Sequence, residues 1–246
     1  MRDIRVYIDQ PLVTGEPVEL TDELVSHLGK VLRLKAGDTL VMFNGKGGEY
    51  HAEVENLARR SGSVVIGEYD PVERESALHT RLVQALGKGD RTEWALRKAV
   101  ELGVSEIVPL TTQRTQVKIT DQKNDQRHRR WLGMIISACE QSGRTRIPLL
   151  RSVVGFEQWT SAQPVSGQCL MLDPRAAQPL QIDPTVSEVE ILVGPEGGFS
   201  AEEYQLACER GYQPTSLGPR VLRTETAPVA ALALLQFQAG DWGTQT

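Results

Sequence analysis

Three short loops in the C-terminal half of the sequence combine glycine and proline with charged residues, and each follows an apolar run typical of a strand. They cover residues 172–175 (Leu-Asp-Pro-Arg), 194–200 (Gly-Pro-Glu-Gly-Gly-Phe-Ser) and 217–227. In open α/β sheets, ligands bind outside the carboxyl ends of the strands, where such loops meet. Glycine lets the backbone approach a ligand closely. The loops therefore predict a ligand site, although tight turns that need glycine would give the same pattern.

Charged side chains on the second and third loops could act on a bound substrate. The candidate catalytic residues are Glu196, Arg220, Arg223 and Glu225. A carboxylate can accept a proton, and a guanidinium group can stabilise a developing negative charge. A salt bridge between Arg223 and Glu225 that only shapes the loop is the alternative interpretation.

The sequence lacks the usual motifs of metal-binding proteins, serine hydrolases and nucleotide-binding proteins. The four histidines are dispersed and form no metal-ligand spacing, so we expect no metal site. The G-x-S-x-G elbow, the phosphate-binding P-loop and the G-x-G-x-x-G fingerprint do not occur. The three cysteines are odd in number and form no C-x-x-C pair, which favours a reducing, cytoplasmic compartment. The sequence has no apolar run of about 18 residues to span a membrane, and its start lacks the apolar region of a secretory signal.

The net charge of −5 hides a strong asymmetry along the chain. Residues 81–151 hold 14 Lys/Arg against 7 Asp/Glu, whereas residues 1–80 hold 9 against 14 and residues 152–246 hold 4 against 11. A basic segment between acidic ends is typical of a local face that binds a polyanion such as a nucleic acid. Scattered, solvated arginines are the alternative.

The first seventy residues read as short strands. Alternating or continuous apolar runs at 2–8, 40–43, 49–54 and 63–67 predict strands, and glycines at 45–48 predict a hairpin turn. Thr21 can cap a short helix between the first two runs. The pattern predicts a small β-barrel or sandwich, followed by a linker over residues 70–77.

From residue 81 onward, strand-like and helical segments alternate. Strands are expected at 81–86, 106–110, 169–172, 189–193 and 215–217, and helices at 90–102, 123–142, 201–210 and 227–238. Ser200 and Glu203 have the spacing of a capping box. Such alternation predicts an α/β domain with a mainly parallel sheet, whose strand ends position the three loops.

The second and third loops together resemble the signature of the SPOUT methyltransferases. More closely, the chain resembles the bacterial small-subunit (16S) ribosomal RNA uridine-N3 methyltransferase family. Further matching segments are 27–38 (His-Leu-Gly-Lys-Val-Leu-Arg-Leu-Lys-Ala-Gly-Asp), 88–94, 98–103 and 140–144 (Glu-Gln-Ser-Gly-Arg). The resemblance runs from about residue 2 to residue 238 and is weak over 151–168.

The resemblance implies a PUA-like β domain over residues 1–73, for RNA recruitment, and a SPOUT-type α/β methyltransferase domain with a trefoil knot over 78–241. It also implies a homodimer and S-adenosylmethionine as cofactor, bound by leucines that flank the adenine and by the backbone of the glycine loops. The implied cofactor residues are Leu172, Gly194, Pro195, Glu196, Gly197, Gly198, Leu217, Gly218, Leu222 and Ala227.

Methylation of uracil N3 requires loss of its proton, so the site needs a base or a cation that stabilises the uracil anion. Arg220 or Arg223 is expected to stabilise the O2/O4 edge, and Glu225 or Glu196 to position or accept the proton. The ribosomal RNA, alone or within the small subunit, is expected to contact basic side chains. These are Arg2, Arg5, Arg33, Lys88, Arg91, Arg114, Lys123, Arg127, Arg130 and Arg144.

Two other functions fit the same sequence. The first is a different SPOUT reaction, such as ribose 2′-O methylation, in which the loops hold the same cofactor. The second is a non-catalytic RNA-binding factor for ribosome assembly that retains the fold. A generic phosphate-binding α/β enzyme fits less well, because the P-loop is missing.

Overall fold

The computed structural model describes residues 4–116, 121–161 and 166–243. For residues 121–123 it describes the helical backbone only. The chain separates into two compact units. The first contains the residues up to Glu75 together with Cys139–Ile147, and the second contains Ser76–Ala138 and the chain from Pro148 onward.

The first unit is built on a five-stranded sheet with the strand order β1-β3-β4-β5-β2. β1 pairs parallel with β3, and the other neighbours are antiparallel. The apolar faces of the strands enclose a core that includes Leu28, Met42 and Ile66, all fully buried. The strands are β1 (Arg5–Tyr7), β2 (Pro17–Glu19), β3 (Thr39–Phe43), β4 (Glu49–Leu57) and β5 (Gly62–Asp70).

The helix cap predicted at Thr21 is present in this unit. The Thr21 side chain accepts a hydrogen bond from the Leu24 N–H and starts helix α1 (Asp22–Ser26). The chain continues as a π-helical turn, η1 (His27–Val31), which the sequence pattern did not predict. Gly45, Gly47 and Gly48 all have positive φ in the β3–β4 turn, a conformation that L side chains rarely adopt.

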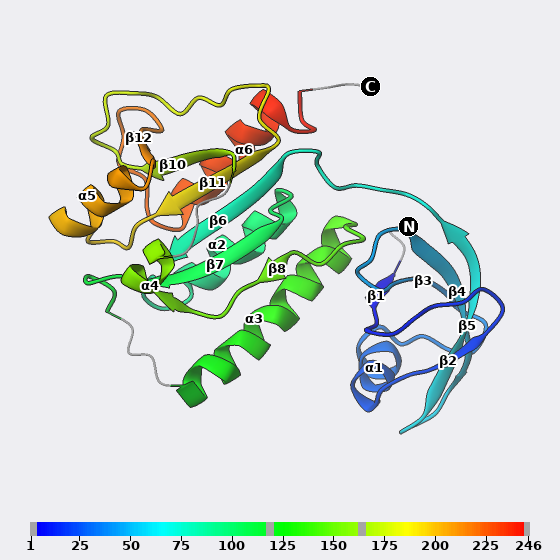
Figure 1. Ribbon diagram of the computed structural model, residues 1–246. Coiled ribbons are helices and arrows are strands. Elements are labelled where there is room, and N and C mark those ends of the chain that lie inside the picture. The colour runs from blue at the N-terminus through cyan, green and yellow to red at the C-terminus, as the bar shows by residue number, and fades with distance from the viewer. Residues whose placement is uncertain (1–3, 117–120, 162–165, 244–246) are drawn as a thin grey trace. The chain divides into compact units, whose positions relative to one another are not determined.

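The second unit contains a parallel sheet with the strand order β12-β10-β11-β6-β7-β8, and β9 also pairs with β7 (Figure 1). The prediction of an α/β fold with a parallel sheet is therefore confirmed. The short strands β8 and β9 were not predicted. The strands are β6 (His79–Ala85), β7 (Glu106–Thr111), β8 (Leu149–Leu150), β9 (Val154–Gly155), β10 (Gln168–Leu172), β11 (Glu188–Val193) and β12 (Gln213–Thr215).

The capping box predicted at Ser200 is confirmed, whereas the short helix α4 was not predicted. Ser200 and Glu203 form both hydrogen bonds of the capping box that opens α5. Helices α2 and α6 contact one another and pack on β6, and α4 packs on β7. The helices are α2 (Arg91–Glu101), α3 (Asp121–Ser142), α4 (Phe156–Ser161), α5 (Ala201–Glu209) and α6 (Thr226–Ala239).

Candidate functional site

The three predicted loops leave neighbouring strands at one edge of the sheet. β12, β10 and β11 are adjacent and parallel, so their carboxyl ends at Thr215, Leu172 and Val193 point in the same direction (Figure 1). β6 is the next strand in the sheet, and its end supplies a fourth loop, residues 86–90. The sheet order therefore brings together segments that lie far apart in the sequence.

Glu196 links the 194–200 loop, called the glycine loop below, to the loop that follows β6. Its Oε1 atom accepts hydrogen bonds from Arg91 Nη1 at 2.6 Å and from the Lys88 backbone N–H at 3.1 Å. Burial acts to raise the pKa of the Glu196 carboxyl, but the backbone N–H groups and Arg91 outweigh it and hold this pKa below its usual range. Glu196 is thus a stable anion at neutral pH, so it is better suited to hold the two loops together than to accept a proton.

Glu225 differs from Glu196 because its charge is only loosely paired. Its Oε1 lies 3.9 Å from Arg91 Nε and 4.0 Å from Arg223 Nη1. Its Oε2 is buried and has no hydrogen-bond partner among the described residues. A buried acceptor without a partner is costly, so an oxygen of this kind suits a site that receives a donor from a ligand. The Arg223–Glu225 salt bridge of the alternative interpretation is present at 4.0 Å, and 78% of the Arg223 side chain remains exposed.

Two buried polar residues at this edge were not predicted. Thr224 Oγ1 donates a hydrogen bond to Gly194 O at 2.8 Å, and Gln84 Nε2 lies 3.4 Å from Thr224 Oγ1. Gln84 is the penultimate residue of β6 and is fully buried. A polar residue within the apolar run 82–86 was the signal in the sequence that could have identified it.

Apolar and glycine positions of the loops are partly accessible. Leu172, Leu217, Leu222, Gly194 and Ala227 are half-buried, whereas Pro195 is buried. The carbonyl oxygen of Gly197 accepts a hydrogen bond from Arg114 Nη1 at 2.7 Å. The backbone has positive φ at Gly198 and Gly218. Half-buried leucines beside open backbone groups provide a surface on which a flat, partly apolar ligand can lie.

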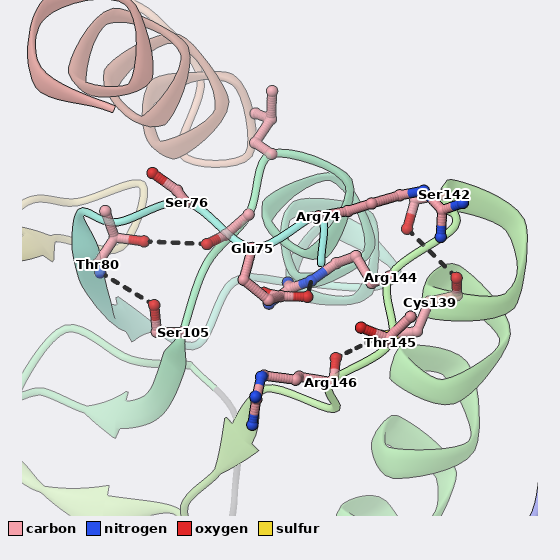
Figure 2. A network of polar contacts seen from close by, with 12 residues as sticks. Arg74, Glu75, Ser76, Thr80, Ser105, Cys139, Ser142, Arg144, Thr145 and Arg146 are labelled. Carbon is pink, nitrogen blue, oxygen red and sulfur yellow. Dashed lines mark hydrogen bonds and ion pairs between the residues drawn. The ribbon is translucent and has the colours of Figure 1, made fainter. Parts of the chain in front are cut away.

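Two of the arginines that are expected to contact RNA, Arg144 and Arg5, have internal partners for their guanidinium groups. Arg144 pairs with Glu75 through its Nε at 3.0 Å and through Nη2, and 6% of its side chain is exposed (Figure 2). Arg5 pairs with Glu49 and donates from Nη2 to Arg144 O at 3.0 Å. Buried charges of this kind are paired for structural reasons. The sequence could not reveal this, because Glu75 lies far from the 140–144 motif.

The other basic candidates fall into three groups. Arg33, Lys88, Arg114 and Arg130 are exposed, although Arg130 also pairs with Glu93 at 2.7 Å. Arg91 and Arg127 are half-buried, and the Arg127 guanidinium carbon lies 5.6 Å from the centre of the Trp131 ring. Arg2 and the Lys123 side chain lie outside the described residues.

A cavity of about 550 Å³ lies among β6, β7, β11 and α4, away from the loops. Its charged lining forms a chain of ion pairs in which Glu106 contacts Arg151 and Arg81, and Arg81 contacts Glu190. Tyr212 donates a hydrogen bond to Glu190. These ion pairs link neighbouring strands of the sheet and favour a structural role, although Arg81 Nε has no hydrogen-bond partner among the described residues.

Within the described part of the chain, no group of three or more His, Cys, Asp or Glu side chains could hold a metal ion. No helix in that part is long and apolar enough to cross a membrane.

The parallel sheet defines an α/β protein, and the loops at the carboxyl ends of its strands form the candidate ligand site. The chain matches the RNA methyltransferase domain over residues 74–236 and the RNA methyltransferase PUA domain over residues 20–67. The chain therefore belongs to the RNA methyltransferase family, with a PUA domain before the methyltransferase domain.

Individual relatives cover nearly the whole chain. The ribosomal RNA small subunit methyltransferase E of Bacillus subtilis is 30% identical, with 93% of each chain covered. A structure described as a methyltransferase of Legionella pneumophila with bound SAM is 41% identical, covers 98% of this chain and 100% of its own, and has a TM-score of 0.94. Ribosomal RNA small subunit methyltransferase E of Neisseria gonorrhoeae bound to S-adenosyl methionine is 36% identical over the same shares, with a TM-score of 0.91.

Proposed function

We propose that this protein transfers a methyl group from S-adenosylmethionine to N3 of a uridine in small-subunit (16S) ribosomal RNA. The observation that carries the proposal is the convergence of the 172–175, 194–200 and 217–227 loops at adjacent strand ends. The names of the relatives support the substrate, and two similar structures that contain the methyl donor support the cofactor. The resemblance of the loops to the uridine-N3 family supports the position of the methyl group.

The residues at the loops fit the proposed cofactor. Leu172, Leu217 and Leu222 offer half-buried apolar surface to the adenine. When bound, the cofactor supplies an electrophilic methyl group on a sulfonium. A trefoil knot formed by these loops is part of the proposal, because the resemblance implies it.

The charged residues of the loops can handle the uracil proton. Glu225 is the preferred proton acceptor, because one of its oxygens lacks a partner, whereas Glu196 is held as an anion by Arg91 and two backbone contacts. Arg220 and Arg223 are exposed, and either side chain can approach the O2/O4 edge of the base, where negative charge develops as the N3 proton leaves. Arg91 would then stabilise both carboxylates, since it lies within reach of each.

Exposed basic residues of the second unit supply the proposed RNA contacts. Lys88 and Arg114 flank the loops, and Arg130 lies on α3. Contacts of this kind position phosphates without reading sequence. The PUA domain, over residues 1–73, would recruit the RNA for the methyltransferase domain, over 78–241. The reaction would take place in the cytoplasm.

Helix α6 supports a homodimer. It is apolar on nearly every side, yet Phe237 exposes 65% and Leu234 40% of their surface, and Trp242 just beyond its end exposes 54%. A helix of this composition must be covered by a core or by an interface. An exposed apolar patch on a monomer marks an interaction site, and we propose that a second copy covers it.

The proposal is tested by mapping the methylated nucleotide. Ribosomal RNA from cells that lack the protein is incubated with the purified full-length protein and S-adenosylmethionine, digested to nucleosides and examined by mass spectrometry. The expected product is a methyl group on the uracil base. A methyl group on the ribose would indicate the 2′-O reaction, and RNA binding without cofactor binding would indicate an assembly factor.

A further inference from the structure

A chain of hydrogen bonds connects the end of β6 to the glycine loop through two residues that the proposed mechanism does not use. Gln84 is 1% exposed and Thr224 is 8% exposed. Gln84 Nε2 lies 3.4 Å from Thr224 Oγ1 and 3.0 Å from Ala85 O. Thr224 Oγ1 lies 2.8 Å from Gly194 O. The chain therefore joins β6, the 217–227 loop and the first residue of the 194–200 loop.

The direction of each hydrogen bond follows from the chemistry of the groups. Gly194 O can only accept, so the single proton of the Thr224 hydroxyl is donated to it. The Thr224 oxygen must then accept from Gln84, whose amide has two N–H donors. These donors are directed at Thr224 Oγ1 and Ala85 O, which fixes the orientation of the carboxamide.

The other end of the Gln84 amide shows that packing alone does not explain this residue. Its Oε1 is buried and has no hydrogen-bond partner among the described residues. Methionine has a similar size and would fill the same space without a buried, unpaired acceptor. The amide therefore contributes through its donors, and these act on Thr224 and on the backbone of its own strand.

We propose that Gln84 and Thr224 are positioning residues that hold the 217–227 loop against Gly194. Thr224 lies directly before Glu225 and two residues after Leu222, so its side chain fixes the backbone from which both project. A displacement of about 1 Å at a reacting group can cost about a hundredfold in rate. This inference rests on the proposed function, because Leu222 matters here as part of the cofactor site and Glu225 as the proposed proton acceptor.

The test compares variants that keep or remove the hydroxyl group. Thr224→Val removes the hydroxyl with little change of shape, and Thr224→Ser keeps it. The dissociation constant of S-adenosylmethionine is measured by calorimetry on the full-length protein, below the melting temperature of every variant. Loss of one buried hydrogen bond predicts about tenfold weaker binding for Thr224→Val, and Thr224→Ser should recover most of that loss. Gln84→Met should also bind about tenfold more weakly, and it gives the same readout if Thr224→Val does not fold.

A double variant and a matched control make the result specific. Because Gln84 acts through Thr224, Gln84→Met combined with Thr224→Val should bind about as weakly as Thr224→Val alone, whereas independent effects would multiply to about a hundredfold. Thr160→Val is the control, because Thr160 is as buried and donates its hydroxyl to Glu157 O at 2.9 Å in α4. It should not change cofactor affinity.

The outcomes separate this inference from the proposed function. A wild-type protein that binds no S-adenosylmethionine would remove both. A wild-type protein that binds it, together with a Thr224→Val variant that binds equally well, would overturn only the positioning role. A multiplicative loss in the double variant would also overturn it, because Gln84 would then act by a route that does not pass through Thr224.

Discussion

Arg91 Nη1 lies 2.6 Å from Glu196 Oε1, although 105 positions separate the two residues in the chain. The Lys88 backbone N–H donates to the same oxygen, at 3.1 Å. The loop after β6 is thereby tied to the glycine loop after β11, and the two strands are neighbours in the sheet. The pair is therefore a consequence of strand order, and it connects a basic segment with the proposed cofactor loops.

Glu196→Gln should impair methyl transfer much more than stability. The Arg91–Glu196 pair is partly exposed, so its loss should change the free energy of unfolding by no more than about 1 kcal/mol. The glycine loop loses its charged anchor, and we expect kcat/KM for RNA methylation to fall by about tenfold, which corresponds to about 1.4 kcal/mol. Glu101→Gln is the control, because it breaks the similarly exposed Lys98–Glu101 pair on α2. Equal kinetics for both variants would contradict the anchoring role.

Arg220→Ala and Arg223→Ala test the stabilisation of the uracil anion. The variant that lacks the stabilising guanidinium should lose about 100-fold to 1,000-fold in kcat, as when one oxyanion donor is removed. The affinity for S-adenosylmethionine should stay unchanged, since both side chains are exposed. Arg97→Ala, an exposed arginine on α2, is the control. If both loop variants methylate RNA at the wild-type rate, these arginines have no catalytic role.

Arg144→Ala should destabilise the protein, whereas Arg146→Ala should not. Removal of Arg144 leaves the mostly buried Glu75 carboxylate without its partner, at a cost of about 3–5 kcal/mol. Arg146 pairs with Glu73 in an exposed position, so its loss should cost about 0–1 kcal/mol. Both values are obtained from urea denaturation of the full-length protein. A small effect of Arg144→Ala would contradict a stabilising role of the Arg144–Glu75 pair.

RNA affinity should fall steeply with salt. Each phosphate contact with single-stranded RNA contributes about 0.7 to the slope of log K against log salt concentration. Lys88→Ala should therefore reduce the slope by about 0.7, measured by filter binding at several salt concentrations. Arg97→Ala serves again as the control and should leave the slope unchanged. A wild-type slope near zero would exclude the phosphate contacts.

Phe237→Glu should convert the proposed homodimer to a monomer. Phe237 is an exposed apolar side chain, and a charge within the proposed apolar interface would be desolvated without a partner, which is strongly unfavourable. Sedimentation equilibrium gives the mass of the wild-type protein and the variant. Glu202→Gln on α5, an exposed substitution outside α6, should leave the mass unchanged. A monomeric wild-type protein would contradict the proposal directly.

Local patterns predicted most elements of the C-terminal half, but not the short elements β8, β9 and α4. The alternation of strands and helices predicted the parallel sheet, because each apolar run and each cap depends on residues only a few positions apart. The Ser200–Glu203 capping box is an example, since both of its hydrogen bonds span three residues. The loops at the strand ends could be identified for the same reason.

Only the tertiary structure decided which charged groups meet. The sequence made Arg144 a candidate for RNA contacts because it lies in a matched glycine-containing motif, and Arg5 because it is a basic residue of the first domain. The fold places their guanidinium groups against Glu75 and Glu49, 69 and 44 positions away. It also joins Gln84 to Thr224 across 140 positions. Pairings at such separations depend on strand order and packing. The caps, turns and apolar runs that define the elements depend only on residues a few positions apart, so the sequence alone determines them.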